Sequence, residues 1–103
     1  MGGRPLLVLA LVSGAVSDAV AQQSYSNLGR DLAAACANCH GTNGVSRADI
    51  PGLAGRERSE LTRLMQDFRA GKRPATVMHQ IAKGYSDEQI EAIASYLSAQ
   101  KAK

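Results

Sequence analysis

The sequence has very few large aromatic side chains from which to build a hydrophobic core. Its 103 residues include no Trp and only one Phe. A small domain buries only a marginal core from its own side chains, and metals or disulfides often make up the difference. We therefore expect a bound group to supply part of the apolar centre of this protein.

The sequence also lacks an apolar run long enough to cross a membrane, which needs roughly 20 residues. Leu6–Val12 is apolar, but polar, small and charged residues soon interrupt the pattern: Ser13, Gly14, Ser17 and Asp18. Ala19-Val20-Ala21 then has the small-x-small form of a leader-peptidase site. We predict an export signal at residues 1–21, cleaved after Ala21, and a mature domain at residues 22–103. The alternative, an uncleaved membrane anchor, is disfavoured.

Only two cysteines are present, Cys36 and Cys39, and His40 directly follows the second. A disulfide between them would close a very short loop and stabilise the chain little. A redox dithiol usually lies between a strand and a helix, and no strand pattern is visible. A zinc site needs further ligands, and His79 is the only other histidine.

Cys-x-x-Cys-His is, in contrast, the sequence form of covalent haem attachment. Cys36 and Cys39 would then bond a single haem c, and His40 would supply an imidazole to the iron. A helical turn carries both sulfurs along one edge of such a ring. Haem is the favoured interpretation, and zinc and dithiol chemistry stay open as alternatives.

The spacing of apolar residues predicts helices and loops, and therefore an all-α fold. A first helix is expected at about residues 27–36, with Leu28, Leu32 and Ala35 on one face. A second is expected at about residues 58–70, ended by Gly71. Its apolar stripe consists of Leu61, Leu64, Met65 and Phe68.

A short third helix is expected at about residues 76–83, ended by Gly84. The last helix begins with a capping box at Ser86–Gln89. Its apolar stripe consists of Ile90, Ile93, Ala94 and Leu97, and Lys101 and Lys103 lie at its basic end. Residues 41–55 are rich in Gly, Asn and Asp and contain a Pro, which is typical of a long functional loop.

The order of these parts resembles the class I cytochromes c. Residues 50–55, IPGLAG, resemble the proline loop of the small bacterial cytochromes c4 and c553. Residues 73–100, RPATVMHQIAKGYSDEQIEAIASYLSAQ, resemble the cytochrome subunit of flavocytochrome c sulfide dehydrogenase. The resemblance covers essentially the whole mature domain. It implies the class I fold, about four short helices wrapped around one covalent haem.

The resemblance further implies that Met78, in the T-V-M segment, is the second axial ligand of the iron. A His and Met pair is a common environment for haem that transfers electrons. It also implies that the Pro51 carbonyl accepts a hydrogen bond from the ring of His40, although Pro51 could simply shape a turn. Leu53 would pack on the haem.

Two further expectations concern the helix crossing and the residue before the last helix. Gly29 or Leu32 is expected to form a helix crossing with Tyr96. Tyr85 is expected either near the haem or at the end of the methionine segment.

Two other residues could in principle bind the iron. Met65 belongs to an apolar helical stripe, which favours a core position. His79 would give a bis-histidine site, but neighbours on a helical turn point in different directions. If Met78 faces the iron, His79 is expected to face solvent.

The chain carries a formal net charge of +3. Basic residues cluster around the second predicted helix: Arg56, Arg58, Arg63, Arg69, Lys72 and Arg73. Such a cluster is usually a solvated face, but it could steer an acidic redox partner. No nucleic-acid-binding motif is present.

We expect a periplasmic electron-transfer protein with no catalytic residues of its own. The resemblance implies that an FAD-containing sulfide dehydrogenase subunit donates its electrons. One alternative is a free, soluble c4/c553-like carrier. Another is a haem protein or enzyme whose open sixth position binds small ligands.

Overall fold

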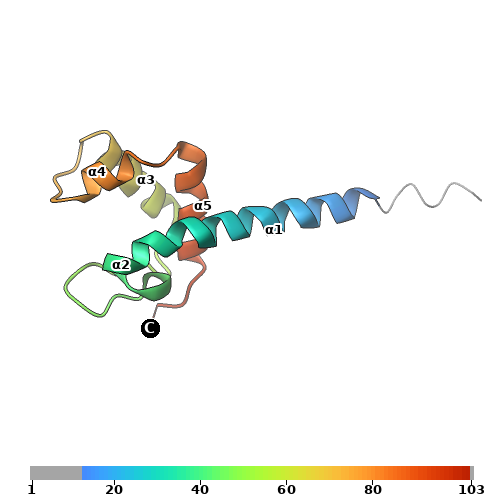
Figure 1. The fold of residues 1–103 in the computed structure, drawn as a ribbon, viewed down its shortest axis with the longest axis horizontal. Coiled ribbons are helices and arrows are strands. Elements are labelled where there is room, and N and C mark those ends of the chain that lie inside the picture. Colours follow the sequence, from blue (N-terminus) through green and yellow to red (C-terminus); the bar gives the residue numbers. More distant parts are fainter. Residues whose placement is uncertain (1–12, 103) are drawn as a thin grey trace, which may run out of the picture.

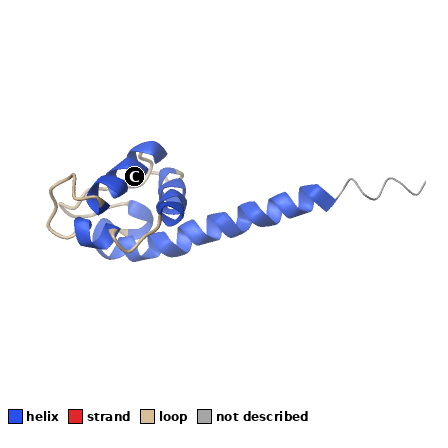
Figure 2. Ribbon diagram, turned by 90° about the horizontal axis from the view of Figure 1, so that it is seen from above, coloured by secondary structure: helices blue, strands red, loops and turns tan. Residues whose placement is uncertain are grey.

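A computed structural model gives the fold of residues 13–102, and this part of the chain contains helices and loops but no strand. The predicted all-α class is confirmed. The long helices are α1 (Ser13–Ala33), α3 (Arg58–Arg69) and α5 (Asp87–Ser98). Shorter elements are the 3₁₀ turns η2 (Ala34–Cys36) and η3 (Thr42–Gly44) and the helices α2 (Ala37–His40) and α4 (Met78–Ala82). All but the first part of α1 gather at one end of the molecule (Figures 1 and 2).

α1 and α5 cross with their backbones in close contact. A Cβ atom placed on Gly29 would lie 2.4 Å from the carbonyl oxygen of Ala92 and 3.1 Å from Cβ of Tyr96. Only glycine permits this approach. The predicted crossing of Gly29 with Tyr96 is confirmed, and Leu32 packs against the core instead.

The core lies where α1, α3 and α5 meet, and it is built mainly from small side chains. Its central cluster consists of Ala33, Leu61, Ile93, Ala94 and Leu97. Five of the nine buried hydrophobic residues among those described are alanines, and none is aromatic. Half-buried residues surround the cluster: Leu32, Leu53, Tyr85 and Tyr96. The chain's own side chains therefore fill only a small centre.

The two amphipathic helices α3 and α5 follow their sequence patterns closely. α3 ends at a glycine cap: Gly71 has φ 74°, its N–H donates to Phe68 O at 3.1 Å, and the N–H of Lys72 donates to Asp67 O at 2.9 Å. α5 begins with the predicted capping box between Ser86 and Gln89. The whole predicted stripe of α5 is buried.

The first helix differs from its prediction at both ends. It already includes Ser13, because no proline interrupts residues 13–33. Near its end the chain tightens into η2, which changes the direction of successive side chains. Ala35 is consequently exposed, and Gly29 and Ala33 are buried on this helix instead.

The limits of α4 and α5 differ from those expected from the sequence. α4 is shorter than expected because Val77, with φ −132°, is not helical. α5 ends at Ser98, so Lys101 lies beyond its last turn, and Lys103 lies outside the described residues. Leu6–Val12 also lies outside them. Within the described residues, no helix combines the length and the apolar character needed to span a membrane.

Candidate haem site

The two cysteines lie on consecutive short helical elements. Cys36 ends η2 and is half-buried, whereas Cys39 in α2 is exposed, and neither forms a disulfide. Residues three apart on a helical turn share a face, so both thiols point to one side. Burial raises the pKa of the Cys36 thiol, and a hydrogen bond with backbone opposes this in part.

His40, the last residue of α2, is oriented by the loop that follows it. Its Nδ1 lies 2.7 Å from the carbonyl oxygen of Pro51. Because a carbonyl oxygen only accepts hydrogen bonds, Nδ1 carries the ring proton and donates it. In the neutral ring, the lone pair then lies on Nε2, which is the form of imidazole that binds a metal.

The loop over residues 41–55 brings Pro51 to His40 by folding back on itself. Gly41, with φ 88°, lets the chain turn where a Cβ atom would lie 2.1 Å from Val45 O. The carbonyl oxygen of Gly44 then accepts from the N–H groups of Leu53 at 2.8 Å and Ala54 at 3.1 Å. These bonds hold the two arms of the loop together beside α2.

Two further hydrogen bonds tie this loop to α5. The N–H of Gly55 donates to Leu97 O at 3.0 Å, and the Tyr96 hydroxyl donates to Asn43 Oδ1 at 2.6 Å. The loop is thus fixed to the last helix at both of its ends. The position of Pro51 relative to His40 consequently depends on α5 as well as on the loop.

Met78 is the first residue of α4 and is half-buried. α4 lies at the same end of the molecule as α2, away from the projecting part of α1 (Figure 1). Val77 and Ile81, which flank Met78 along the chain, are exposed apolar residues. Met65, the other described methionine, is half-buried on α3.

His79 was expected to face solvent, but the structure places it partly within the protein. Its side chain is half-buried, and its Nδ1 atom is buried without a hydrogen-bond partner. α4 packs against α3, so a residue beside Met78 also meets protein rather than water. Thr62 Oγ1 on α3 is likewise buried without a partner.

Tyr85 lies between α4 and α5, and its hydroxyl is within electrostatic range of Cys36. Its ring packs against the central core cluster. Burial raises the pKa of its hydroxyl, and a charge on Cys36 would raise it further. Tyr85 thus meets both expectations: it ends the methionine segment, where its N–H donates to Ala82 O at 3.3 Å, and it lies near Cys36.

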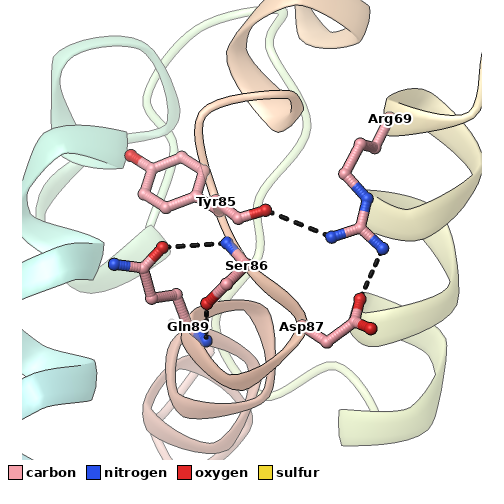
Figure 3. A network of polar contacts seen from close by, with 5 residues as sticks. All are labelled: Arg69, Tyr85, Ser86, Asp87 and Gln89. Atoms are coloured by element: carbon pink, nitrogen blue, oxygen red, sulfur yellow. Dashed lines mark hydrogen bonds and ion pairs between the residues drawn. The ribbon is translucent and has the colours of Figure 1, made fainter.

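Arg69 forms a contact network that sequence reasoning missed. Its Nη1 donates to the Tyr85 carbonyl oxygen at 3.1 Å, and its Nη2 pairs with Asp87 (Figure 3). Beside it, Ser86 and Gln89 form the capping box of α5 (Figure 3). From the sequence, Arg69 is only one member of a basic cluster. Its partners are 16 and 18 positions away along the chain, too far for a pattern within one helix to indicate.

The basic cluster around α3 is partly neutralised within the chain. Arg56 pairs with Glu60 at 3.0 Å, and Arg58 pairs with Glu91 at 2.9 Å. The guanidinium of Arg73 lies 5.8 Å from the centre of the Phe68 ring. The ion pairs of Arg56, Arg58 and Arg69 leave a weaker positive field than the residue count suggests, whereas the contact of Arg73 with a neutral ring leaves its charge in place.

The side chains at this end of the molecule fit a haem. Two cysteines share one side of a helical turn, and the imidazole that follows them can offer Nε2 to a metal. Apolar side chains that are half-buried or exposed are available to pack on the ring: Leu32, Leu53, Tyr85, Val77 and Ile81. Zinc has less support, since no group of three His, Cys, Asp or Glu residues able to hold a metal occurs within residues 13–102.

Comparison with known families matches residues 24–97 to the family described as cytochrome c oxidase, cbb3-type, subunit III. The chain belongs to this family of c-type cytochrome domains. Its members carry covalently attached haem c, and this chain has the two cysteines that such attachment needs. The match identifies the domain and not an oxidase assembly.

Individual relatives agree with this assignment. The cytochrome subunit of sulfide dehydrogenase from Chlorobaculum tepidum is 43% identical over 68 residues, which cover 66% of this chain and 62% of that protein. The thiosulfate dehydrogenase electron acceptor of Stutzerimonas stutzeri is 38% identical over 95 residues, which cover 89% and 44%. The chain thus spans less than two thirds of the length of either relative.

A solved structure supports the fold directly. The crystal structure of reduced recombinant cytochrome c4 from Pseudomonas stutzeri matches with a TM-score of 0.71 and 26% identity. The match covers 77% of this chain and 50% of that one. The class I cytochrome c fold expected from the sequence is confirmed, and the relatives carry names of cytochromes and of an electron acceptor.

Proposed function

We propose that this protein transfers single electrons through a haem c bonded to Cys36 and Cys39, with His40 and Met78 as the axial ligands. The observation that carries the proposal is the contact of His40 Nδ1 with Pro51 O at 2.7 Å. It keeps the proton on Nδ1 and leaves Nε2 to bind the iron. Haem iron supplies the chemistry by changing between its ferrous and ferric states.

The side chains around the iron have separate tasks in this proposal. Met78 occupies the sixth position and thereby keeps small ligands away from the metal. Its thioether sulfur favours the ferrous state and raises the reduction potential. Leu53 covers part of the ring and excludes water.

Carbon monoxide distinguishes this proposal from a haem protein with an open sixth position. The reduced wild-type protein should bind carbon monoxide poorly at neutral pH, and Met78→Ala should bind it readily. Met65→Leu is the matched control, because it replaces the other described methionine at nearly constant volume, and it should behave like the wild type. Ready binding by the wild-type protein would contradict Met78 as a ligand.

His79 offers a bis-histidine alternative that a second variant tests. Under the proposal, His79→Gln leaves both axial ligands in place and keeps the visible spectrum and the resistance to carbon monoxide. If His79→Gln bound carbon monoxide while Met78→Ala still resisted it, His79 and not Met78 would be the second axial ligand.

We infer that the electrons come from a flavoprotein sulfide dehydrogenase subunit. The support is the 43% identity to a cytochrome subunit of such an enzyme. A relative named as an electron acceptor of thiosulfate dehydrogenase, and the likeness to cytochrome c4, keep a free soluble carrier as the second candidate. Purification from its natural source decides between them: a yellow, FAD-containing protein bound to the haem protein supports the first, and a red monomer supports the second.

We also propose that the protein works in the periplasm after loss of residues 1–21. Covalent haem attachment by Cys36 and Cys39 and the Ala19–Ala21 motif support this. Mass spectrometry of the exported haem protein should give a chain that starts at or near Gln22. A full-length chain held in the membrane fraction would contradict the proposal.

A further inference from the structure

Residues 70–84 form the segment that carries Met78, and we call them the Met78 segment. It leaves α3 immediately after Arg69 and reaches Tyr85 just before α5 begins. Apart from the short helix α4, it consists of turns and loop. Backbone bonds inside it are local, such as Ile81 N–H to Val77 O at 3.1 Å and Gly84 N–H to Ile81 O at 3.1 Å.

Arg69 joins the two ends of this segment. It is the last residue of α3, and its guanidinium contacts the Tyr85 carbonyl and the Asp87 carboxylate on the far side (Figure 3). The planar guanidinium offers a separate nitrogen to each oxygen, Nη1 to the Tyr85 carbonyl and Nη2 to Asp87, a fixed geometry that a single ammonium nitrogen reproduces only in part. Its side chain is 31% exposed, compared with 52% for Arg58 in the other ion pair from α3 to α5.

Tyr85 gives this contact a direct link to the haem site. The carbonyl that Arg69 contacts belongs to the residue whose ring packs against the core cluster and whose hydroxyl lies within electrostatic range of Cys36. The N–H of the same residue donates to Ala82 O at the end of α4, at 3.3 Å. Tyr85 therefore connects the Arg69 contact to α4 through its N–H and to the core cluster through its ring.

We propose that Arg69 is a positioning residue that closes the base of the Met78 segment and so keeps Met78 at the iron. The proposal rests on Met78 being the ligand, as proposed above. Loss of the Arg69 contacts lets the Met78 segment open more often while α3 and α5 stay folded. Opening exposes the sixth position of the iron without removing the methionine.

The test compares Arg69→Met with Arg58→Met in the haem-loaded protein. Both changes keep the aliphatic stem and remove one ion pair between α3 and α5, but only the first frees the Tyr85 carbonyl. Arg69→Met should raise the rate of carbon monoxide binding to reduced protein about tenfold, the scale of a lost charged hydrogen bond. Arg58→Met should stay within about twofold of the wild type, because exposed ion pairs contribute little.

Hydrogen exchange gives a readout that does not depend on ligand binding. In Arg69→Met the amides of Ile81, Gly84 and Tyr85 should exchange about tenfold faster. The amide of Ile93, inside α5, should change much less. Equal acceleration at Ile93 would mean that Arg69 merely stabilises the whole fold, and it would overturn the proposal.

Two further variants keep the test decisive if Arg69→Met folds poorly. Asp87→Asn weakens the ion pair but leaves the carbonyl contact, so its effect should be smaller. Arg69→Lys should restore part of the wild-type behaviour. Wild-type rates in Arg69→Met, or a larger effect from Asp87→Asn, would contradict the role of the carbonyl contact.

The variants distinguish the role of Arg69 from the role of Met78 as the axial ligand. If Met78→Ala opens the site but Arg69→Met changes nothing, only the role of Arg69 is wrong. If Met78→Ala itself changes nothing, Met78 is not the ligand and both proposals fall. Combining Arg69→Met with Met78→Ala should add no further gain in carbon monoxide binding, because both act through the same methionine.

Discussion

At the scale of single residues, Tyr85 shows how burial controls a proton near the haem attachment. Burial disfavours the phenolate and raises the pKa of the hydroxyl above its usual value of 10.0. The second contribution, from a charge on Cys36, vanishes once that sulfur is a thioether. The contribution of burial remains in the haem-loaded protein.

We therefore predict a pH dependence of stability that can be assigned to Tyr85. The folded state binds the hydroxyl proton more tightly than the unfolded state does. The resulting stabilisation is complete below about pH 10 and is lost as pH rises through the folded pKa. The ultraviolet absorbance of the wild type is titrated with base, and that of Tyr85→Phe is subtracted. The difference should show a titration midpoint above pH 10, and a midpoint below pH 10 would contradict the prediction.

His40 shows what residue identity alone cannot specify. The motif Cys-x-x-Cys-His names the imidazole, but the proton on Nδ1 is fixed by a carbonyl eleven positions later. The family resemblance implied that contact; periodicity and spacing gave no sign of it. Arg69 was beyond sequence reasoning altogether, because its partners come close only after α3 and α5 have packed together.

At the scale of elements, the crossing of α1 and α5 depends on Gly29. Adding a methyl group there would press it against the backbone of Ala92, which cannot move aside like a flexible side chain. The two helices would have to separate along their whole contact. Alanine's better helix propensity, about 1 kcal/mol, offsets only part of that cost.

We predict that Gly29→Ala lowers the free energy of unfolding by about 1–3 kcal/mol, the usual cost of overpacking. Gly84→Ala is the control, since its added Cβ would have only an ordinary contact, 3.4 Å from Ile81 O. Denaturant titration of the two haem-loaded variants measures the difference. A Gly29→Ala protein as stable as Gly84→Ala would show that the crossing tolerates a larger residue.

The start of α5 is set by its capping box. The N–H of Gln89 donates to Ser86 Oγ at 3.1 Å, and the N–H of Ser86 donates to Gln89 Oε1 at 2.8 Å. These bonds satisfy two N–H groups at the helix start. They lie directly beside the Tyr85 carbonyl that Arg69 holds.

We predict that Ser86→Ala costs about 1 kcal/mol of stability and that Ser86→Asp restores most of it, because aspartate is an equally good cap. Thermal unfolding followed by circular dichroism checks both variants. If Ser86→Asp were no better than Ser86→Ala, the side-chain oxygen would not be the stabilising group.

The helix limits that the sequence predicted best are those marked by a capping signal. α3 has an apolar stripe and ends at Gly71, so both of its limits are accurate to about one residue. The capping box gives the start of α5 equally well, but no signal marks its end, which comes at Ser98 rather than at the basic residues beyond it. α1 has neither signal at its start, and its beginning was missed. Ala35 was misplaced because nothing in the sequence marks the change from α-helix to the 3₁₀ turn.

At the scale of the whole molecule, the composition of the core indicates that an attached haem would complete it. The described core is rich in alanine and has no buried aromatic residue. Larger apolar side chains such as Leu32, Leu53 and Tyr85 surround it half-buried. An attached haem would give these side chains a large apolar partner.

We predict that a Cys36→Ala, Cys39→Ala double variant holds no covalent haem and lacks a cooperative unfolding transition. Haem staining after denaturing electrophoresis tests the first part, and circular dichroism during heating tests the second. A cooperative transition like that of the wild type would show that the protein side chains suffice for folding. Retained stain would show that another residue bonds the haem.

The central claim is that His40 and Met78 together fill both axial positions of the iron. The most direct measurement is the red absorption spectrum of the oxidised haem protein, where a thioether bound to ferric iron gives a weak charge-transfer band. We predict that the band is present in the wild type and in Met65→Leu and absent in Met78→Ala. A wild-type spectrum without the band, or a Met78→Ala spectrum that keeps it, would contradict the claim.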